Sequence, residues 1–263
     1  MNDLLAAALL GLLQGITEFL PISSTAHLAI AEKVLRLDPA RYGLTFSVAL
    51  HMGTLLAVLL YYAGTWRDLA RDALRGRFAL VGLLVVATIP AVVTALVFGD
   101  FIAGPLRDPL IIAAALVVGS GLFVLAERLA TDRRSEATTR DAAAIGVAQA
   151  LALIPGMSRS GLTISMGLAR GLRRDEATRL SFLLSTPAVF GAGLKTMLDA
   201  RKASAVLDHP DALAVGFIVS FVSGIAAIAL LVRFLRGHSL AWFVPYRLAL
   251  AGVIVAAVAA GAL

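Results

Sequence analysis

The sequence contains no cysteine, and charged residues make up only 15% of its 263 positions. The lack of cysteine excludes disulfide bonds, thiolate metal sites and cysteine nucleophiles. Hydrophobic residues reach 59% and the mean hydropathy is +0.89, whereas soluble domains carry about 45–50% apolar and about 25% charged residues. This composition excludes a soluble globular domain and predicts an integral membrane protein that crosses the bilayer several times.

The hydrophobic stretches are separated by short charged loops and have about the 20 residues that a helix needs to span a bilayer. Lipid offers the backbone no hydrogen-bonding partner, so each stretch is expected to be helical. Two stretches are interrupted, one at Pro21 and the other at Pro155-Gly156. The expected segments are 4–34 with the first break, 44–63, 78–98, 110–126, 142–168 with the second break, 180–197, 213–231 and 248–263.

A broken segment followed by three spans thus occurs twice, which divides a single membrane domain (1–263) into halves of about 1–130 and 140–263. If each broken segment is a re-entrant helical hairpin that returns to its own side, each half crosses the membrane three times. An odd number of crossings turns the second half upside down. The predicted fold is therefore an all-α polytopic membrane protein with an inverted-topology repeat.

Basic residues between the spans indicate the orientation. With the loop after the first span inside the cell, most of them lie on the inner side, and Arg233, Arg236 and Arg247 are counted there as loop residues. Arg107 and Lys195 fall on the outer side. The net charge of +6 is therefore interpreted as a topology signal and a contact with membrane lipid headgroups, not with nucleic acid.

Each broken segment carries one charge within its apolar stretch. Glu18 is the only charged residue between Asp3 and Glu32, and Arg159 the only one between Asp141 and Arg170. An ionisable group at bilayer depth costs about 2.5–3.5 kcal/mol or more, which makes it a functional candidate. A structural ion pair that joins the two halves is the alternative, but it does not explain the hydroxyl groups around both charges.

Those hydroxyls are dense in both breaks. An isolated Ser or Thr in a membrane helix usually bonds to a helix carbonyl, but here the hydroxyls flank a proline break, where helix N-termini present free amides. A helix N-terminus beside an arginine is an anion site suited to phosphate. The residues are Thr17, Ser23, Ser24 and Thr25 in the first break and Ser158, Ser160, Thr163 and Ser165 in the second.

The first break also contains a hydroxyl and an imidazole at helical spacing, Ser24 and His27. Side chains at i and i+3 lie on one helix face. His27 could therefore take the proton of Ser24, or attack phosphorus itself. His51 lies in a polar notch of the next span (His51-Met-Gly-Thr54), and it either lines the same cavity or is structural.

The two breaks resemble the two signature motifs of the undecaprenyl-diphosphate phosphatase family, the bacitracin-resistance type. The motifs are Gln-Gly-Ile-Thr-Glu-Phe-Leu-Pro-Ile-Ser-Ser-Thr-Ala-His at 14–27 and Pro-Gly-Met-Ser-Arg-Ser-Gly-Leu-Thr at 155–163. The resemblance implies hydrolysis of undecaprenyl diphosphate to undecaprenyl phosphate and inorganic phosphate, which recycles the lipid carrier of cell-wall synthesis and confers bacitracin resistance. It also implies a multi-pass protein of the bacterial inner membrane, with the active site facing the outer, periplasmic side.

The resemblance further implies roles for single residues. Ser24 is the expected nucleophile, His27 its base, and Glu18 the group that orients His27 or a metal ion. His27 could instead be the nucleophile, or could activate water directly. Arg159 is expected to be catalytic as well, because it binds and neutralises the diphosphate. The other residues expected to bind the substrate are Ser23, Thr25, Ser158, Ser160, Thr163 and Gln14.

Many family members have Glu at the position of Gln14, so a metal site made of two carboxylates is in doubt in this chain. A divalent cation, Mg²⁺ or Ca²⁺, held by Glu18 and the diphosphate is the cofactor expected.

A membrane transporter or lipid-phosphate flippase is the rival interpretation, because inverted repeats with broken helices are typical of transporters. The Ser-Ser-Thr-Ala-His sequence at 23–27 favours an enzyme, since transport needs no nucleophile beside a base. A non-catalytic scaffold does not fit two charges within apolar segments. The sequence does not indicate the oligomeric state or the preferred prenyl chain length.

Overall fold

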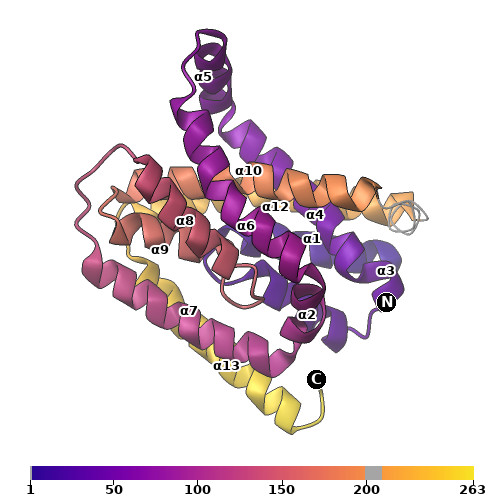
Figure 1. Ribbon diagram of the computed structural model, residues 1–263. Coiled ribbons are helices and arrows are strands. Elements are labelled where there is room, and N and C mark those ends of the chain that lie inside the picture. Colours follow the sequence, from indigo (N-terminus) through magenta and orange to yellow (C-terminus); the bar gives the residue numbers. More distant parts are fainter. Residues whose placement is uncertain (1, 199–208) are drawn as a thin grey trace.

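The computed structural model describes residues 2–198 and 209–263, and the regular structure in these ranges is helical (Figure 1). The all-α prediction is confirmed for the described residues, apart from one isolated bridge between Arg134 and Leu172. The helices of the first half are α1 (Asp3–Phe19), α2 (Ser24–Val34), α3 (Pro39–Tyr42), α4 (Leu44–Tyr61), α5 (Ala63–Leu74), α6 (Ala79–Ala103), η1 (Pro105–Arg107) and α7 (Pro109–Leu129). Those of the second half are α8 (Thr139–Leu151), α9 (Arg159–Ala169), α10 (Arg174–Leu198), α12 (Pro210–Leu235), η2 (Leu240–Phe243) and α13 (Val244–Ala259).

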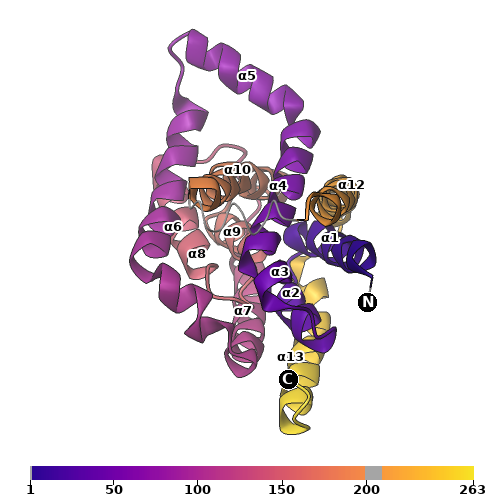
Figure 2. The ribbon, with the colours of Figure 1, turned by 90° about the vertical axis from the view of Figure 1, so that its right-hand side faces the viewer.

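Four stretches of the described chain are long and apolar enough to cross a membrane: Ala79–Ala103, Pro109–Leu129, Pro210–Leu235 and Leu240–Ala259. A fifth is the pair α4 and α5, whose axes are bent by 73°. The expected span at 180–197 lies within α10, a helix of 25 residues. This helix is too polar to count among the candidate membrane spans. Many of its residues are buried, and in Figure 2 it lies in the middle of the molecule between α4 and α6.

One segment expected to be a loop is a helix. Residues 63–74 form α5, which projects from the body between the ends of α4 and α6 (Figures 1 and 2) and has no buried residue. Its arginines, Arg67 and Arg71, alternate with apolar residues at helical spacing. Such an amphipathic pattern suits a helix at a water–lipid boundary, and hydropathy alone does not detect it because the segment is short and charged.

Both expected breaks are present, and they share a backbone feature. Ser23 precedes α2 with φ 75°, and Ser158 precedes α9 with φ 72°. This left-handed conformation costs a residue with a side chain about 1–3 kcal/mol, and such strain concentrates at functional sites. The two serines therefore occupy equivalent positions in the two broken segments.

The first helix of each broken segment packs against the other half of the chain. Helix α1 packs along α12, and α8 packs along α6, while α7 and α13 run side by side (Figure 1). The α1–α12 contact depends on Gly15, because a Cβ there would lie 2.6 Å from the Ser220 carbonyl oxygen and 2.8 Å from the Gly224 nitrogen. The helix that ends at the first break is thus held at backbone distance from α12.

This close contact predicts a difference between two Gly→Ala variants. Gly15→Ala should lower the unfolding temperature in detergent by several degrees, because overpacking costs about 1–3 kcal/mol. Gly82→Ala in α6, where a Cβ meets nothing within 4 Å, should leave it unchanged or raise it slightly. Equal unfolding temperatures for the two variants would contradict the packing described.

Candidate active site

The two breaks touch each other. The Gly156 N–H donates to Ser23 Oγ over 3.1 Å, and Ser160 Oγ donates to the Leu20 carbonyl over 3.4 Å. Ser23, Ser158 and Ser160 are buried. Residues more than 130 positions apart in the sequence therefore form one polar region inside an apolar protein.

Arg247 holds the two breaks together, and it is not the loop residue expected from the sequence. It belongs to α13, its exposed fraction is 0%, and it donates to the Pro21 carbonyl of the first break (3.2 Å) and the Gly156 carbonyl of the second (2.9 Å). It also bonds to the Leu116 carbonyl and the Ser120 hydroxyl, each over 3.1 Å. Within residues 2–198 and 209–263 no carboxylate pairs with it.

The Glu18 carboxylate is the centre of the site. Arg159 pairs with Oε1, so the opposite charges of the two breaks meet. Oε2 accepts from Ser24 Oγ over 2.7 Å and from Gln14 Nε2 over 3.2 Å, and His51 Nε2 lies 3.4 Å from it. Glu18 is 8% exposed, and removal of one partner from a buried ion pair costs about 3–5 kcal/mol. A group that replaces Glu18 as the partner of Arg159 must therefore be an anion that fits the same space.

The second break orients Arg159. Its Nη1 donates to the Ser181 carbonyl over 3.3 Å. Ser158 Oγ accepts from the Gly161 N–H and caps α9, while Thr163 Oγ1 lies 2.6 Å from Ser181 Oγ. Arg159 is the first residue of α9. Its guanidinium therefore lies next to the positive end of the dipole of that helix.

Histidine 27 is turned away from Ser24 and towards α13. Its Nδ1 lies 2.7 Å from the Ser23 carbonyl, which can only accept, so Nδ1 carries the hydrogen. Its Nε2, 2.6 Å from the Tyr246 hydroxyl, then accepts from that tyrosine. The imidazole near the Ser24–Glu18 pair in this structure is His51, for which the sequence left two interpretations open, and its place in the cavity wall agrees with the first of them. Tyr246 was not expected from the sequence.

Some of the expected hydroxyls have ordinary helical partners. Thr17 Oγ1 donates to the Leu13 carbonyl over 2.6 Å, and Thr163 Oγ1 donates to the Arg159 carbonyl over 2.8 Å. Thr25 Oγ1 lies 3.2 Å from Ser23 Oγ.

A cavity of about 340 Å³ adjoins the first break. Thr25, His51 and Pro155 are part of its wall, so both breaks reach it. Two basic residues that the charge pattern assigns to the outer side, Arg107 and Lys195, line it as well. Asp100 lines it too, and Arg107 pairs with Glu32 over 3.6 Å, so the cavity joins the surroundings of Glu18 to a wall with charges of both signs.

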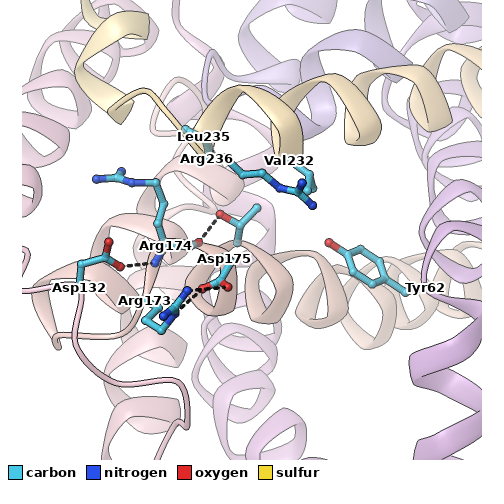
Figure 3. Close-up of a pocket in the computed structure, with 9 residues that line it drawn as sticks. Tyr62, Asp132, Arg173, Arg174, Asp175, Val232, Leu235 and Arg236 are labelled. Atoms are coloured by element: carbon cyan, nitrogen blue, oxygen red, sulfur yellow. Dashed lines mark hydrogen bonds and ion pairs between the residues drawn. The ribbon is translucent and has the colours of Figure 1, made fainter.

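A second polar cavity, of about 390 Å³, contains none of the expected site residues (Figure 3). Its charged groups are paired with one another or with neighbours: Arg173 with Asp175, and Arg174 with Asp132 and Glu127. Figure 3 shows the Arg173–Asp175 pair and the bond from the Arg174 backbone N–H to Asp132 at the start of α10, and it also shows Arg236 and Tyr62, which line the same cavity. Because no residue of either break lines this cavity and most of its charged side chains are paired, it is not the candidate active site.

The site was tested for its fit to a divalent cation. Within the described ranges there is no group of three His, Asp or Glu side chains that could hold a metal. Gln14 Oε1, however, is buried without a hydrogen-bond partner in the described part of the chain, next to the Glu18 carboxylate. An amide oxygen and a carboxylate are ligands that Mg²⁺ and Ca²⁺ accept, so the residues present fit a cation that takes its remaining ligands from a substrate.

Comparison with known proteins identifies the family of the chain. Residues 7–253 match the family described as "Bacitracin resistance protein BacA". The chain belongs to this family. Three BacA-type relatives, each named undecaprenyl-diphosphatase, come from Rubrobacter xylanophilus (41% identical, covering 97% of this chain and 98% of the relative), Thermodesulfovibrio yellowstonii (42%; 97% and 97%) and Mycobacterium ulcerans (40%; 96% and 95%).

The position of Arg247 in this BacA-family chain generates a prediction. Arg247→Met leaves the carbonyls of both breaks without a donor, at about 1–3 kcal/mol for each unsatisfied group. The variant should unfold at a clearly lower temperature in detergent than Arg233→Met, which removes an exposed arginine of α12. Wild-type stability of Arg247→Met would show that the breaks are held in place by other contacts.

Proposed function

We propose that this protein hydrolyses undecaprenyl diphosphate to undecaprenyl phosphate and inorganic phosphate. Its membership of the BacA family and the name undecaprenyl-diphosphatase of its relatives support this activity. The observation that carries the proposal is the cluster of Glu18, Ser24 and Arg159, in which a hydroxyl, its proton acceptor and an anion-binding guanidinium meet inside an apolar helix bundle.

The diphosphate displaces Glu18 from Arg159 in this mechanism. The guanidinium binds the terminal phosphate through two N–H groups, with help from the hydroxyls of the second break, Ser158, Ser160 and Thr163. Lys195, which lines the adjoining cavity, attracts the anion. The prenyl tail stays in lipid or among the helices, so only the headgroup enters the polar region.

Ser24 Oγ then attacks the terminal phosphorus. The bond from that phosphorus to the bridging oxygen breaks, undecaprenyl phosphate leaves as an anion, and the Ser24 proton passes to Glu18 Oε2, which already accepts its hydrogen bond over 2.7 Å. Water hydrolyses the phosphoserine in a second step, which restores the hydroxyl and releases inorganic phosphate. This geometry favours Glu18 over His27 as the base for Ser24.

In this proposal His27 belongs to the active site but does not deprotonate Ser24. Once its hydrogen bond with Tyr246 opens, Nε2 has a free lone pair and can activate the water of the second step. Attack on phosphorus by His27 itself would leave the Ser24–Glu18 hydrogen bond without a use. Ser23 and Thr25 complete the wall around the headgroup.

A divalent cation, Mg²⁺ or Ca²⁺, is the cofactor we propose. Glu18 and the Gln14 Oε1 atom would hold it together with the diphosphate oxygens. When bound, such an ion neutralises charge that develops on the phosphates.

The finer architecture and the orientation belong to the same proposal. An inverted-topology repeat, with α1–α2 and α8–α9 as re-entrant hairpins, is supported by the equivalent serines before α2 and α9 and by the reciprocal packing of α1 on α12 and α8 on α6. The removal of Arg247 from the inner loops does not change the direction of the charge bias. The cavity at Thr25 then faces the periplasmic side of the inner membrane of a bacterium.

A lipid-phosphate flippase or transporter is the second candidate, and one observation favours it. The cavity beside the site is lined by the start of α4 and the ends of α6 and α10. The cavity of Figure 3 is lined by the start of α10 and the ends of α12 and α4, which are the corresponding elements of the other half. Paired cavities on opposite sides suit alternating access.

Phosphate release from a polyprenyl diphosphate by the purified protein decides between the phosphatase and the transporter. Wild type should release phosphate, chelator should stop it, and Mg²⁺ or Ca²⁺ should restore it. Ser24→Ala, His27→Ala and Arg159→Ala should each lose about 100-fold or more of kcat, a typical effect of removing a catalytic group. Arg159→Lys should also be impaired, because a point charge cannot copy the planar fork.

The control is Arg233→Met, which should keep wild-type turnover. A folded wild type that releases no phosphate with any divalent ion would favour the transporter. Wild-type turnover of Arg159→Lys would contradict the assignment of Arg159 as the phosphate clamp.

A further inference from the structure

His51 is the one imidazole in contact with the Glu18 carboxylate among the described residues. It lies in the middle of α4, and its Nε2 is 3.4 Å from Glu18 Oε2, the same oxygen that accepts the Ser24 hydroxyl. Its side chain is 21% exposed, and it lines the cavity next to the first break. The ring therefore lies between that cavity and the oxygen that takes the proton of Ser24.

The geometry fixes the way in which this ring can act. Nδ1 lies 2.6 Å from the Ser47 carbonyl, one turn earlier in α4, and must donate to it. The contact between Nε2 and the carboxylate is attractive only if Nε2 carries a hydrogen as well. The bond to Ser47 thus anchors the ring to its own helix and directs a second donor at Glu18.

Groups on the neighbouring elements complete the surroundings of His51. Glu18 comes from α1 and Arg159 from α9, while α12 contributes the uncharged Ser220, which donates to the Leu50 carbonyl over 2.8 Å. Asp100, Arg107 and Lys195 lie on other parts of the cavity wall. Among these groups, Glu18 is the one that pairs with His51.

The mechanism proposed above gives Arg159 two tasks that exclude each other. Before substrate binds, Arg159 holds Glu18 Oε1; afterwards it must hold the terminal phosphate. A carboxylate that exchanges this partner for the cation proposed above can turn away from Ser24 unless another group holds Oε2. The Gln14 amide donates to Oε2 as well, over 3.2 Å, but Gln14 lies on α1 together with Glu18 and cannot fix the carboxylate relative to another helix.

We propose that His51 is a positioning residue, which holds Glu18 Oε2 against Ser24 after the diphosphate has taken Arg159. The inference rests on the proposed hydrolase function. His51 acts through Glu18 and does not touch the reacting phosphorus. A merely structural role, in which His51 only ties α4 to α1, would affect folding but would not separate kcat from KM.

The test compares three variants in the phosphate-release assay. His51→Leu removes the donor, whereas His51→Gln keeps an N–H group that can reach Glu18. His238→Leu is the matched control, because His238 makes the same kind of contact, from Nδ1 to the carbonyl four residues earlier (3.0 Å), on an exposed part of the chain.

We expect His51→Leu to lower kcat at least about tenfold with KM within about threefold of wild type, the pattern of an interaction needed in the transition state. His51→Gln should recover most of that loss, and His238→Leu should match wild type. Three results would each overturn the proposal: wild-type kcat in His51→Leu, an effect confined to KM, or no difference between the Leu and Gln variants.

A spectroscopic measurement separates this inference from the proposed function. In protein labelled with ¹⁵N-histidine, the Nε2–H resonance of His51, assigned by its loss in His51→Gln, should persist in Arg159→Ala and disappear or move in Glu18→Ala. Loss of this resonance in Arg159→Ala would show that His51 does not keep its contact with Glu18 when Arg159 is absent. A wild type that releases no phosphate but keeps this resonance pattern would sink the hydrolase and leave the contact itself established.

Discussion

A single buried guanidinium determines the arrangement of the site. Arg247 lies in the interior without a carboxylate partner in the described part of the chain, so carbonyl dipoles must stabilise its charge. A charge that is buried and unpaired is costly, and it persists only where several acceptors converge. The acceptors are carbonyls of both breaks and of α7. Pro21 and Gly156 can supply them because their segments leave the helical ladder and have carbonyls to spare.

The polar groups around Glu18 follow from this constraint. Once the breaks are fixed to one guanidinium, the last turn of α1 and the first turn of α9 face each other, and Glu18 and Arg159 pair between them. The pair satisfies both charges while no substrate is present. It also keeps a guanidinium and a helix N-terminus ready for an anion. In the proposed mechanism this ion pair is the resting state that a diphosphate replaces.

The sequence predicted the features that depend on local composition. Most of the apolar segments, the two breaks and the isolation of Glu18 and Arg159 follow from residue order alone, and in the structure Glu18 and Arg159 form an ion pair. The expected span at 180–197 is the exception, because it lies in a more polar helix. The contacts made by His51 and Tyr246 could not be predicted, because they depend on how α4 and α13 pack against the breaks. Nothing in residue order links His27 to Tyr246, which lies 219 positions away.

The burial of Arg247 was not predicted from the sequence for a different reason. It stands at the edge of an apolar stretch, three residues into α13, where a positive charge usually marks the end of a span. A signal was nevertheless present: η2 and α13 together form an apolar stretch, Leu240–Ala259, and Arg247 is its only charged residue. The same reasoning that singled out Glu18 and Arg159 applies to it once the helix is seen to begin earlier. The helical state of α5 follows from a different pattern, the helical spacing of Arg67 and Arg71 among apolar residues, which hydropathy alone does not detect.

The central claim is that one headgroup exchanges with Glu18 for Arg159 at the junction of the two breaks. The most direct test is a structure of the protein with a non-hydrolysable polyprenyl diphosphate analogue bound. We predict that Arg159 contacts the terminal phosphate, that Ser24 Oγ lies about 3–3.5 Å from its phosphorus, and that His51 stays on Glu18. A headgroup bound elsewhere, for example in the cavity of Figure 3 with the Glu18–Arg159 pair intact, would contradict the account.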